Sequence, residues 1–581
     1  MSNQHPSIGS ADNTADNTSS RKALRIAVKV LFACSAMIMS VLLSLFNLMP
    51  SSALSLDLFA ITTFSALGIV LFLVIKCKFI ERTFSNLNIP LLVLSAALTY
   101  FPCHAAAVEL TDRMSRLFVI REVFVGEIIT HFWGENAALV SSILSAGALF
   151  AAFVFTYCFV NAFVRFIRDL YEKSDKADKI FFFAALFVSV AAISLVYSHT
   201  TAFYSGVDAN GGVRLYDIIY TTDSGEIFDS NAYYSINAEQ NDIRQPLFGL
   251  FAAPFGSLAK LISLIFFFVP NIYPIALAAI QAGLLLLAVI MTAEMMKLRG
   301  LLKAAFFALY ALSFPMLIYV LTMEQYIFSM FWLIMFIYCA LSNRQERQYA
   351  FAAASSSMLT TGVLFPLLSD KRSFWGFVKD IFEAGVKFAS FIILFGQLAL
   401  VANFMEEIGK LMRFSGVELT FGDKLLQFFS FVSSCFFAPA ASTADTLGYM
   451  SYFPDAVTSV SAAGVVLLAL VLLGFALNMK NKFAQICMAW TVFSFVILCV
   501  VGWGTQENGL VLYALYFSWA YISLIFMLFE KVGSYIKNKK AAAVYSVVKY
   551  AVFISFALLM LWVNIPEMAN ILRFGAEYYP A

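Results

Sequence analysis

Charged side chains are scarce in this 581-residue chain. They make up 13% of the residues, about half the share found in ordinary soluble proteins. Hydrophobic residues make up 61%, and Phe alone occupies 62 positions. This balance excludes a water-soluble globule and a disordered chain. A net charge of only +2 offers no basic surface, so nucleic acid is excluded as a partner. The composition predicts an all-α polytopic membrane protein.

Metal-ligand and disulfide patterns are also lacking. The eight Cys are scattered, mostly within apolar runs, and no two of them form a C-x-x-C pair. The four His are equally dispersed. We expect the thiols to pack as small apolar side chains rather than to bind metal or form disulfides. No cofactor is expected, and a divalent metal stays open without being implied by any residue pattern.

The N-terminus lacks the features of a cleaved secretory signal. Residues 1–20 are rich in Ser, Asn and Asp, which predicts a disordered tail. Arg21, Lys22 and Arg25 then precede an apolar run much longer than a signal peptide core, and no small-residue cleavage site follows. We therefore expect a retained first helix and a cytoplasmic N-terminus. The absence of a eukaryotic-type targeting signal favours a bacterial inner (plasma) membrane.

Long apolar runs are what the sequence has in abundance, and thirteen of them are long enough to span a bilayer. They lie at 24–46, 56–76, 88–104, 137–164, 180–198, 272–296, 301–320, 324–341, 381–403, 457–477, 483–502, 509–529 and 543–564. Two further apolar stretches, 247–269 and 348–369, are ambiguous, because each could either cross once or fold without crossing.

The distribution of Lys and Arg decides between these topologies. If neither ambiguous stretch crosses, 25 of the 38 Lys and Arg lie on the cytoplasmic side and 9 outside, whereas two crossings change this to 20 against 14. We therefore expect 247–269 to lie along the outer interface as an amphipathic segment broken at Pro254 and Gly256. We expect 348–369 to form a hairpin of two short helices meeting near residues 360–362. The C-terminus is then outside.

These features predict five regions. They are a cytoplasmic tail (1–20), an N-terminal four-helix membrane extension (21–179), a membrane core (180–403) with a first outer loop at 199–246, a second long outer loop (404–456), and C-terminal membrane helices (457–581). The shorter outer segment 105–136 carries charges at roughly helical spacing, which predicts an interfacial helix there.

The first outer loop carries the residues best suited to chemistry. It holds many acids and five Tyr against only two Arg, and its densest part runs from Tyr220 to Asp229. Tyrosine mixed with carboxylate suits a sugar-binding surface, because the ring offers an apolar face and a polar tip. A carboxylate there can act as general base, and Arg244 can hold a phosphate. A folded acidic loop without chemistry is the alternative interpretation.

The order of elements resembles the GT-C glycosyltransferases, which use polyprenyl-phosphate sugars and include protein O-mannosyltransferases and lipid A aminoarabinose transferases. An outward helix at 180–198, an acidic loop, an Arg244-Gln245-Pro-Leu segment and a returning helix at 272–296 match their plan. The short pair at 348–369 and the long loop 404–456 match it too. The family's usual Asp-Glu pair reads Asp223-Ser-Gly-Glu226 here, and its usual His or Lys before the proline reads Arg244-Gln245.

The resemblance implies a GT-C-like helical bundle and an inverting transfer of a sugar from a polyprenyl-phosphate donor to a lipid, glycan or protein acceptor. It implies Asp223 as the general base, with Asp229 as the second candidate and Glu226 orienting the acceptor or the loop. The residues expected to bind donor or acceptor are Arg244, Gln245, Glu324, Tyr220 and Tyr233.

Two alternatives remain at this point. Glu324 lies in a very short outer turn, where an acid is either functional or simply favoured at a helix N-terminus. For the whole protein, a lipid-linked glycan flippase or transporter is one alternative, and a glycan polymerase or ligase is another. A flippase should place charges in the middle of its spans, and these spans are almost free of them. No internal repeat is visible, which weakens a transporter.

Overall fold

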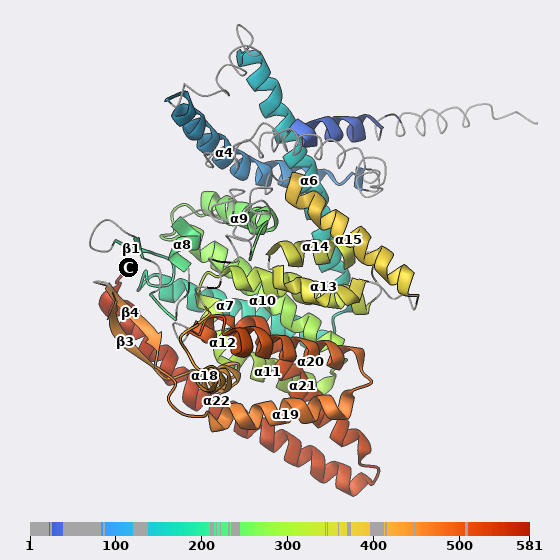
Figure 1. Ribbon diagram of the computed structural model, residues 1–581, viewed down its shortest axis with the longest axis vertical. Helices are drawn as coiled ribbons and strands as arrows, with labels where there is room; N and C mark the ends of the chain where they lie inside the picture. Colours follow the sequence, from blue (N-terminus) through green and yellow to red (C-terminus); the bar gives the residue numbers. More distant parts are fainter. Residues whose placement is uncertain are drawn as a thin grey trace, which may run out of the picture. The chain divides into compact units, whose positions relative to one another are not determined.

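The computed structural model describes the chain in two compact units (Figure 1). The described residues are 23, 26–38, 83–84, 87–119, 137–208, 214–215, 218–220, 222, 224–229, 233, 244–342, 344, 347–357, 359–368, 373–394, 409, 412, 415–446, 449–505 and 509–581. The first unit comprises residues 1–172 with two short segments, 236–238 and 389–402. The second comprises the rest, and each unit is described by itself.

Helices dominate the described residues, and the protein is an all-α membrane protein, as its composition predicts. Seven described helices are long and apolar enough to cross a bilayer, or eight if one bent pair forms a single span. The only strands in this part of the chain form two small antiparallel pairs, β1 (Val207–Asp208) with β2 (Arg214–Leu215) and β3 (Ala441–Thr446) with β4 (Tyr449–Pro454). The expected span at 56–76 lies outside the described residues, and those at 24–46 and 381–403 lie partly outside.

The first unit is built on two long helices, α4 (Ile89–Val119) and α6 (Ala137–Lys173). Its small core centres on Val154 and Cys158 of α6, which pack against aliphatic and aromatic neighbours that include Phe32 and Phe84. Helix α4 continues to residue 119, so the first part of the segment 105–136 is not a separate interfacial helix. The rest of that segment lies outside the described residues.

The second unit begins with α7 (Lys176–Tyr197), α9 (Phe248–Ile265) and α10 (Ile272–Met295). The expected break at Pro254 and Gly256 is wrong, because α9 runs through both residues as one helix. A proline removes one intrahelical hydrogen bond, but packing against neighbouring helices can hold the helix together. Helix α9 packs on α10, and Pro254 and Gly256 are both buried.

The expected single span 301–320 is divided in the structure into α11 (Gly300–Leu312) and α12 (Phe314–Leu321), which are bent by 58°. The break falls at Ser313, whose extended backbone ends α11, and Pro315 lies in the first turn of α12. A proline is well placed at a helix start and cannot continue the helix before it, which explains the bend. Next comes α13 (Gln325–Leu341), buried along almost its whole length.

Two short helical segments follow, α14 (Arg347–Ser357) and η2 (Leu359–Leu368), and then α15 (Phe374–Leu394). Helix α14 ends at Ser357 and η2 begins at Leu359, so η2 continues through the expected meeting point at 360–362. Within η2, the hydroxyl of Thr361 lies 2.7 Å from the hydroxyl of Tyr516. This hydrogen bond ties the pair to the helix that begins at residue 514.

The C-terminal part contains α18 (Phe421–Ser434), α19 (Ala462–Asn478), α20 (Lys482–Phe495), η3 (Val496–Val501), η4 (Gly509–Tyr513), α21 (Ala514–Tyr535) and α22 (Lys539–Tyr578). Helix α21 is the buried centre, and α19 and α20 pack against it. Gly474 of α19 permits this packing, because a Cβ there would lie 2.2 Å from the carbonyl oxygen of Leu524. Most of α22 is exposed, as expected of a helix that faces lipid.

An ion cluster closes one end of the second unit. The Nζ atom of Lys303 lies 2.9 Å from Asp175, 2.9 Å from Asp178 and 2.8 Å from Glu294. The cluster joins the start of α7, the end of α10 and the first turns of α11. Burial alone would raise the pKa of Asp175, but hydrogen bonds from Lys303 and from backbone amides outweigh it and lower that pKa. The distribution of Lys and Arg predicts this end to be cytoplasmic.

Candidate functional site

The first outer loop is folded against the opposite end of the second unit. It contains the short helix α8 (Ser224–Asp229), and Ile219 forms a bridge with Tyr452 of β4. Gly225 is required inside α8, because a Cβ there would lie 2.5 Å from the carbonyl oxygen of Ser205. Gly225 and its helix are thus held by close backbone packing, which fixes α8 against Ser205 near the start of the loop.

Two tyrosines of different loops share one carboxylate oxygen. Tyr220 donates a hydrogen bond of 2.9 Å to Oε1 of Glu567, and Tyr452 donates one of 2.8 Å to the same oxygen. The amide of Asn570 donates to the other oxygen at 3.3 Å. The Tyr220–Tyr452–Glu567 cluster therefore joins the first outer loop, β4 of the second outer loop and helix α22, which ends beside β4 (Figure 1).

The backbone around this cluster is fixed as well. The amide of Tyr220 donates to the carbonyl of Tyr452 at 2.9 Å, and the amide of Tyr452 donates to Ile218 at 2.8 Å. Tyr220 has a φ of 51°, which is rare for a bulky residue and persists only where the surroundings impose it. Burial, followed by the charge of Glu567, raises the pKa of the Tyr220 phenol. The phenol therefore stays protonated and remains a donor.

A second polar cluster lies among aromatic rings. Tyr233 is 1% exposed, its hydroxyl is hydrogen-bonded to the side-chain amide of Gln281, and its ring packs on Phe248 and Phe328. Gln281 also donates to the backbone carbonyl of Glu324 at 3.4 Å. Burial, with the charge of Glu324 among the further causes, raises the pKa of Tyr233 well above its usual value. We name Tyr233, Gln281 and Glu324 the amide cluster.

Glu324 is 1% exposed and occupies the N-cap position of α13, but its side chain does not cap the helix. A buried carboxylate is costly unless it is solvated by neighbouring polar groups. The carbonyl oxygen of the Gln281 side chain is buried and has no hydrogen-bond partner within the described part of the chain. The amide cluster therefore holds polar groups at a depth where packing would otherwise be apolar, which is unusual outside functional sites.

Aromatic contacts connect α8 with the end of α12. The ring of Phe228 in α8 lies 6.3 Å from that of Tyr204 and 5.4 Å from that of Tyr273. Tyr204 in turn packs on Tyr197, with ring centroids 4.8 Å apart, and the Tyr197 hydroxyl donates to the carbonyl of Leu321 at 2.6 Å. The short acidic helix is thus linked through these rings to the end of α12.

The structure places the predicted site residues in different surroundings. Asp223 lies outside the described residues. Asp229 is the last residue of α8, and its side chain is not described, whereas Glu226 in the same helix is exposed. Arg244 is half-buried, Gln245 is buried, and both lie in the turn that leads into α9.

Tyr220 belongs to the cluster on Glu567, whereas Tyr233 and Glu324 belong to the amide cluster. Sequence reasoning missed Glu567, Tyr452 and Gln281. Gln281 could have been found from the sequence, because it is a polar amide inside the apolar run 272–296. Glu567 follows the last apolar run closely, but nothing in the sequence links it to residues 220 and 452.

The described residues contain no group of three or more His, Cys, Asp or Glu arranged to hold a metal ion. Comparison with known protein families, with curated proteins and with solved structures found no match to this chain.

Proposed function

We propose that this protein is a membrane glycosyltransferase of the GT-C type. It would transfer a sugar from a polyprenyl-phosphate donor to a lipid, glycan or protein acceptor on the extracytoplasmic side. One observation carries the proposal: the acidic first loop is folded against the second loop and α22 at the end of the bundle opposite the ion cluster, through Tyr220, Tyr452 and Glu567. A spacer loop without function would need no such anchoring.

The proposed reaction is a single displacement with inversion. Asp223 takes the proton from the acceptor hydroxyl while that oxygen attacks the anomeric carbon of the donor sugar. The bond from that carbon to the phosphate oxygen breaks, and the polyprenyl phosphate leaves with the electron pair. Asp229 is the second candidate for the base. Glu226 is exposed on the same short helix, where it can orient the acceptor.

Donor binding is assigned to the residues around the start of α9. Arg244 would pair with the donor phosphate, because a guanidinium matches phosphate oxygens in a bidentate arrangement. Gln245 lies beside it, and Phe248 at the start of α9 packs on Tyr233. The amide cluster with Glu324 would accept and donate hydrogen bonds to sugar hydroxyls, and the surrounding tyrosine rings suit the apolar faces of a sugar.

We propose an orientation in the membrane for the two ends of the second unit. The ion cluster end is cytoplasmic and the loop end extracytoplasmic, in a bacterial inner membrane with a cytoplasmic N-terminus. A flippase is less well supported. The buried helix α13 carries no Asp, Glu, Lys or Arg, and in α10 the only such residue is Glu294, near the helix end. Neither of these two buried helices therefore carries a charge in its middle.

The test is sugar release from a panel of radiolabelled polyprenyl-phosphate sugars by purified protein with mixed cell-envelope acceptors. We expect transfer by the wild type and a loss of about 100-fold or more in Asp223→Asn, the scale of general base catalysis. Glu418→Gln is the matched control, because Glu418 is an exposed acid in the second outer loop. Its activity should equal that of the wild type.

Other results would redirect the proposal. A loss confined to Asp229→Asn keeps the class and moves the base. Products that carry many sugar units would favour a polymerase or ligase. Absence of transfer with every donor, together with lipid scrambling in vesicles, would contradict the proposal and favour a flippase.

A further inference from the structure

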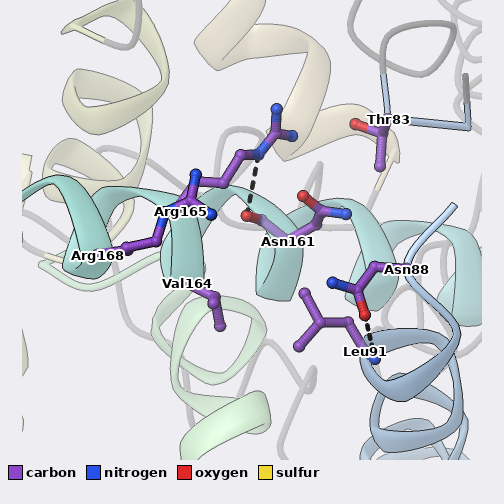
Figure 2. Close-up of a pocket in the computed structure, with 7 residues that line it drawn as sticks. All are labelled: Thr83, Asn88, Leu91, Asn161, Val164, Arg165 and Arg168. Carbon is purple, nitrogen blue, oxygen red and sulfur yellow. Dashed lines mark hydrogen bonds between the residues drawn. The ribbon is translucent and has the colours of Figure 1, made fainter. Parts of the chain in front are cut away.

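A cavity of about 200 Å³ lies within the first unit, between the start of α4 and the last turns of α6 (Figure 2). Its polar lining consists of Thr83, Asn88, Asn161, Arg165 and Arg168. Among the described lining residues, two side chains are cationic and none is acidic. The cavity therefore favours an anionic ligand.

The start of α4 contributes to this preference. Asn88 precedes the helix, and its side-chain oxygen accepts a hydrogen bond of 3.2 Å from the backbone amide of Leu91. The backbone amide of Asn88 donates to the hydroxyl of Tyr157 at 3.0 Å. These bonds fix the first turn of α4 beside the cavity. A helix N-terminus carries partial positive charge, which adds to the field of the arginines.

Asn161 is a second, independent indication of a ligand. It is 6% exposed, lines the cavity, and points toward Asn88 and Thr83 (Figure 2). Its side chain belongs to the cavity lining, so its amide is accessible from the cavity. A ligand oxygen in the cavity can accept a hydrogen bond from that amide.

The two arginines are held at the cavity by their own helix. Nε of Arg165 donates to the carbonyl of Asn161 at 3.3 Å, which orients the guanidinium (Figure 2). Arg168 pairs only loosely with Glu172, at 3.8 Å between exposed side chains. An exposed pair at that distance contributes little, so Arg168 can turn to a ligand at small cost. Two guanidinium groups together match the oxygens of a phosphate group.

Exposed apolar side chains occur at the cavity and near the start of α4. Val164 lines the cavity and is 40% exposed, and near the start of α4 Leu87 is 51%, Ile89 70% and Val93 63% exposed. Arg165 follows directly on the apolar part of α6, so the cavity lies where an apolar helix becomes polar. This is the depth at which lipid headgroups lie, and arginine stems extend to it readily.

We propose that this cavity binds the phosphate group of an anionic membrane lipid, whose acyl or prenyl chain lies along the exposed apolar residues. Arg165 and Arg168 hold the phosphate, Asn161 donates to it, and the N-terminus of α4 faces it. The proposal does not depend on sugar transfer, so either can fail without the other.

The test uses the full-length protein in detergent micelles with a fluorescent phosphatidic acid, and a phosphatidylcholine carrying the same fluorophore as the neutral reference. We expect the wild type to prefer phosphatidic acid. We expect Arg165→Gln combined with Arg168→Gln to weaken that binding by about tenfold or more, since two charge-assisted interactions are lost. Both arginines are exposed, so this variant should fold normally.

Two controls separate the cavity from general charge. Lys173→Gln removes a positive charge from the end of the same helix, outside the cavity, and should keep binding within about twofold. Asn161→Leu should weaken binding while leaving every charge in place. Equal binding by the double arginine variant and the wild type would refute the proposal, as would an equal loss in Lys173→Gln.

Competition with inorganic phosphate distinguishes the source of the phosphate group. We expect millimolar phosphate to leave the bound lipid in place, because contact with the exposed apolar side chains adds affinity that a free ion lacks. Ready displacement of the lipid, with tight binding of phosphate alone, would overturn the lipid assignment and identify the cavity as a site for a soluble phosphate.

Discussion

Replacing Glu567 with alanine removes the acceptor that two buried phenols share. Tyr220 is 1% and Tyr452 5% exposed, so water does not readily replace the lost oxygen. A buried donor that loses its partner costs about 1–3 kcal/mol. Because two donors are affected and Glu567 itself is only partly buried, we expect Glu567→Ala to destabilise the folded protein by about 2–4 kcal/mol.

Thermal unfolding in detergent, followed with a thiol-reactive dye, measures this effect. Cys435 and Cys487 are completely buried and become reactive only when the bundle opens. Glu567→Gln keeps one oxygen acceptor and should cost less, about 1 kcal/mol. Glu577→Gln, an exposed acid farther along the same helix, is the matched control and should unfold like the wild type.

A double-mutant cycle tests the assignment to the two phenols. Tyr452→Phe should destabilise the wild type clearly and the Glu567→Ala variant only slightly, because the hydrogen bond is already absent there. An unfolding temperature of Glu567→Ala equal to that of the wild type would refute the reasoning. So would purely additive effects in the cycle.

Three further predictions concern packing and charge. Gly474→Ala should destabilise the folded protein by about 1–3 kcal/mol, because the added Cβ would collide with the carbonyl of Leu524. A Cβ added at Gly283 would meet no atom within 4 Å, so Gly283→Ala should be neutral or stabilising in the same melting assay. Lys303→Met should cost about 3 kcal/mol, because it leaves clustered carboxylates without their cation; melting like the wild type would contradict this. The pKa of Asp175 is lowered by folding, so its contribution is present above about pH 4 and is lost as the pH falls through the native value. A melting temperature of the wild type that stays constant from neutral pH to pH 3 would contradict this predicted loss of stability.

The membrane class and most helix positions could be predicted from the sequence. A chain inside a bilayer must satisfy its backbone hydrogen bonds within each helix, so long apolar runs have few alternatives. The bend between α11 and α12 was missed although Pro315 was visible, because hydropathy does not register a proline at a helix start. At Pro254 the proline was instead given too much weight. Packing of α9 on α10 keeps the helix continuous although a proline disfavours a helix interior.

The candidate site was predictable only in part. The acidic first loop stood out by composition, and Tyr220, Tyr233 and Glu324 all lie in polar clusters in the structure. The roles of Asp223 and Asp229 stay predictions. The pairing with Glu567 could not be predicted, because it joins residues whose proximity is set by the arrangement of whole helices.

The hydrogen bond between Tyr220 and Glu567 spans 347 positions of the chain, which has a consequence for biosynthesis. At the usual speed of translation the ribosome needs roughly 20 to 70 s to cover that interval. The first outer loop therefore enters its compartment well before the helix that anchors it has been made. The protein would be inserted first and completed late, so nascent chains that stall before α22 should carry a loop that proteases can reach.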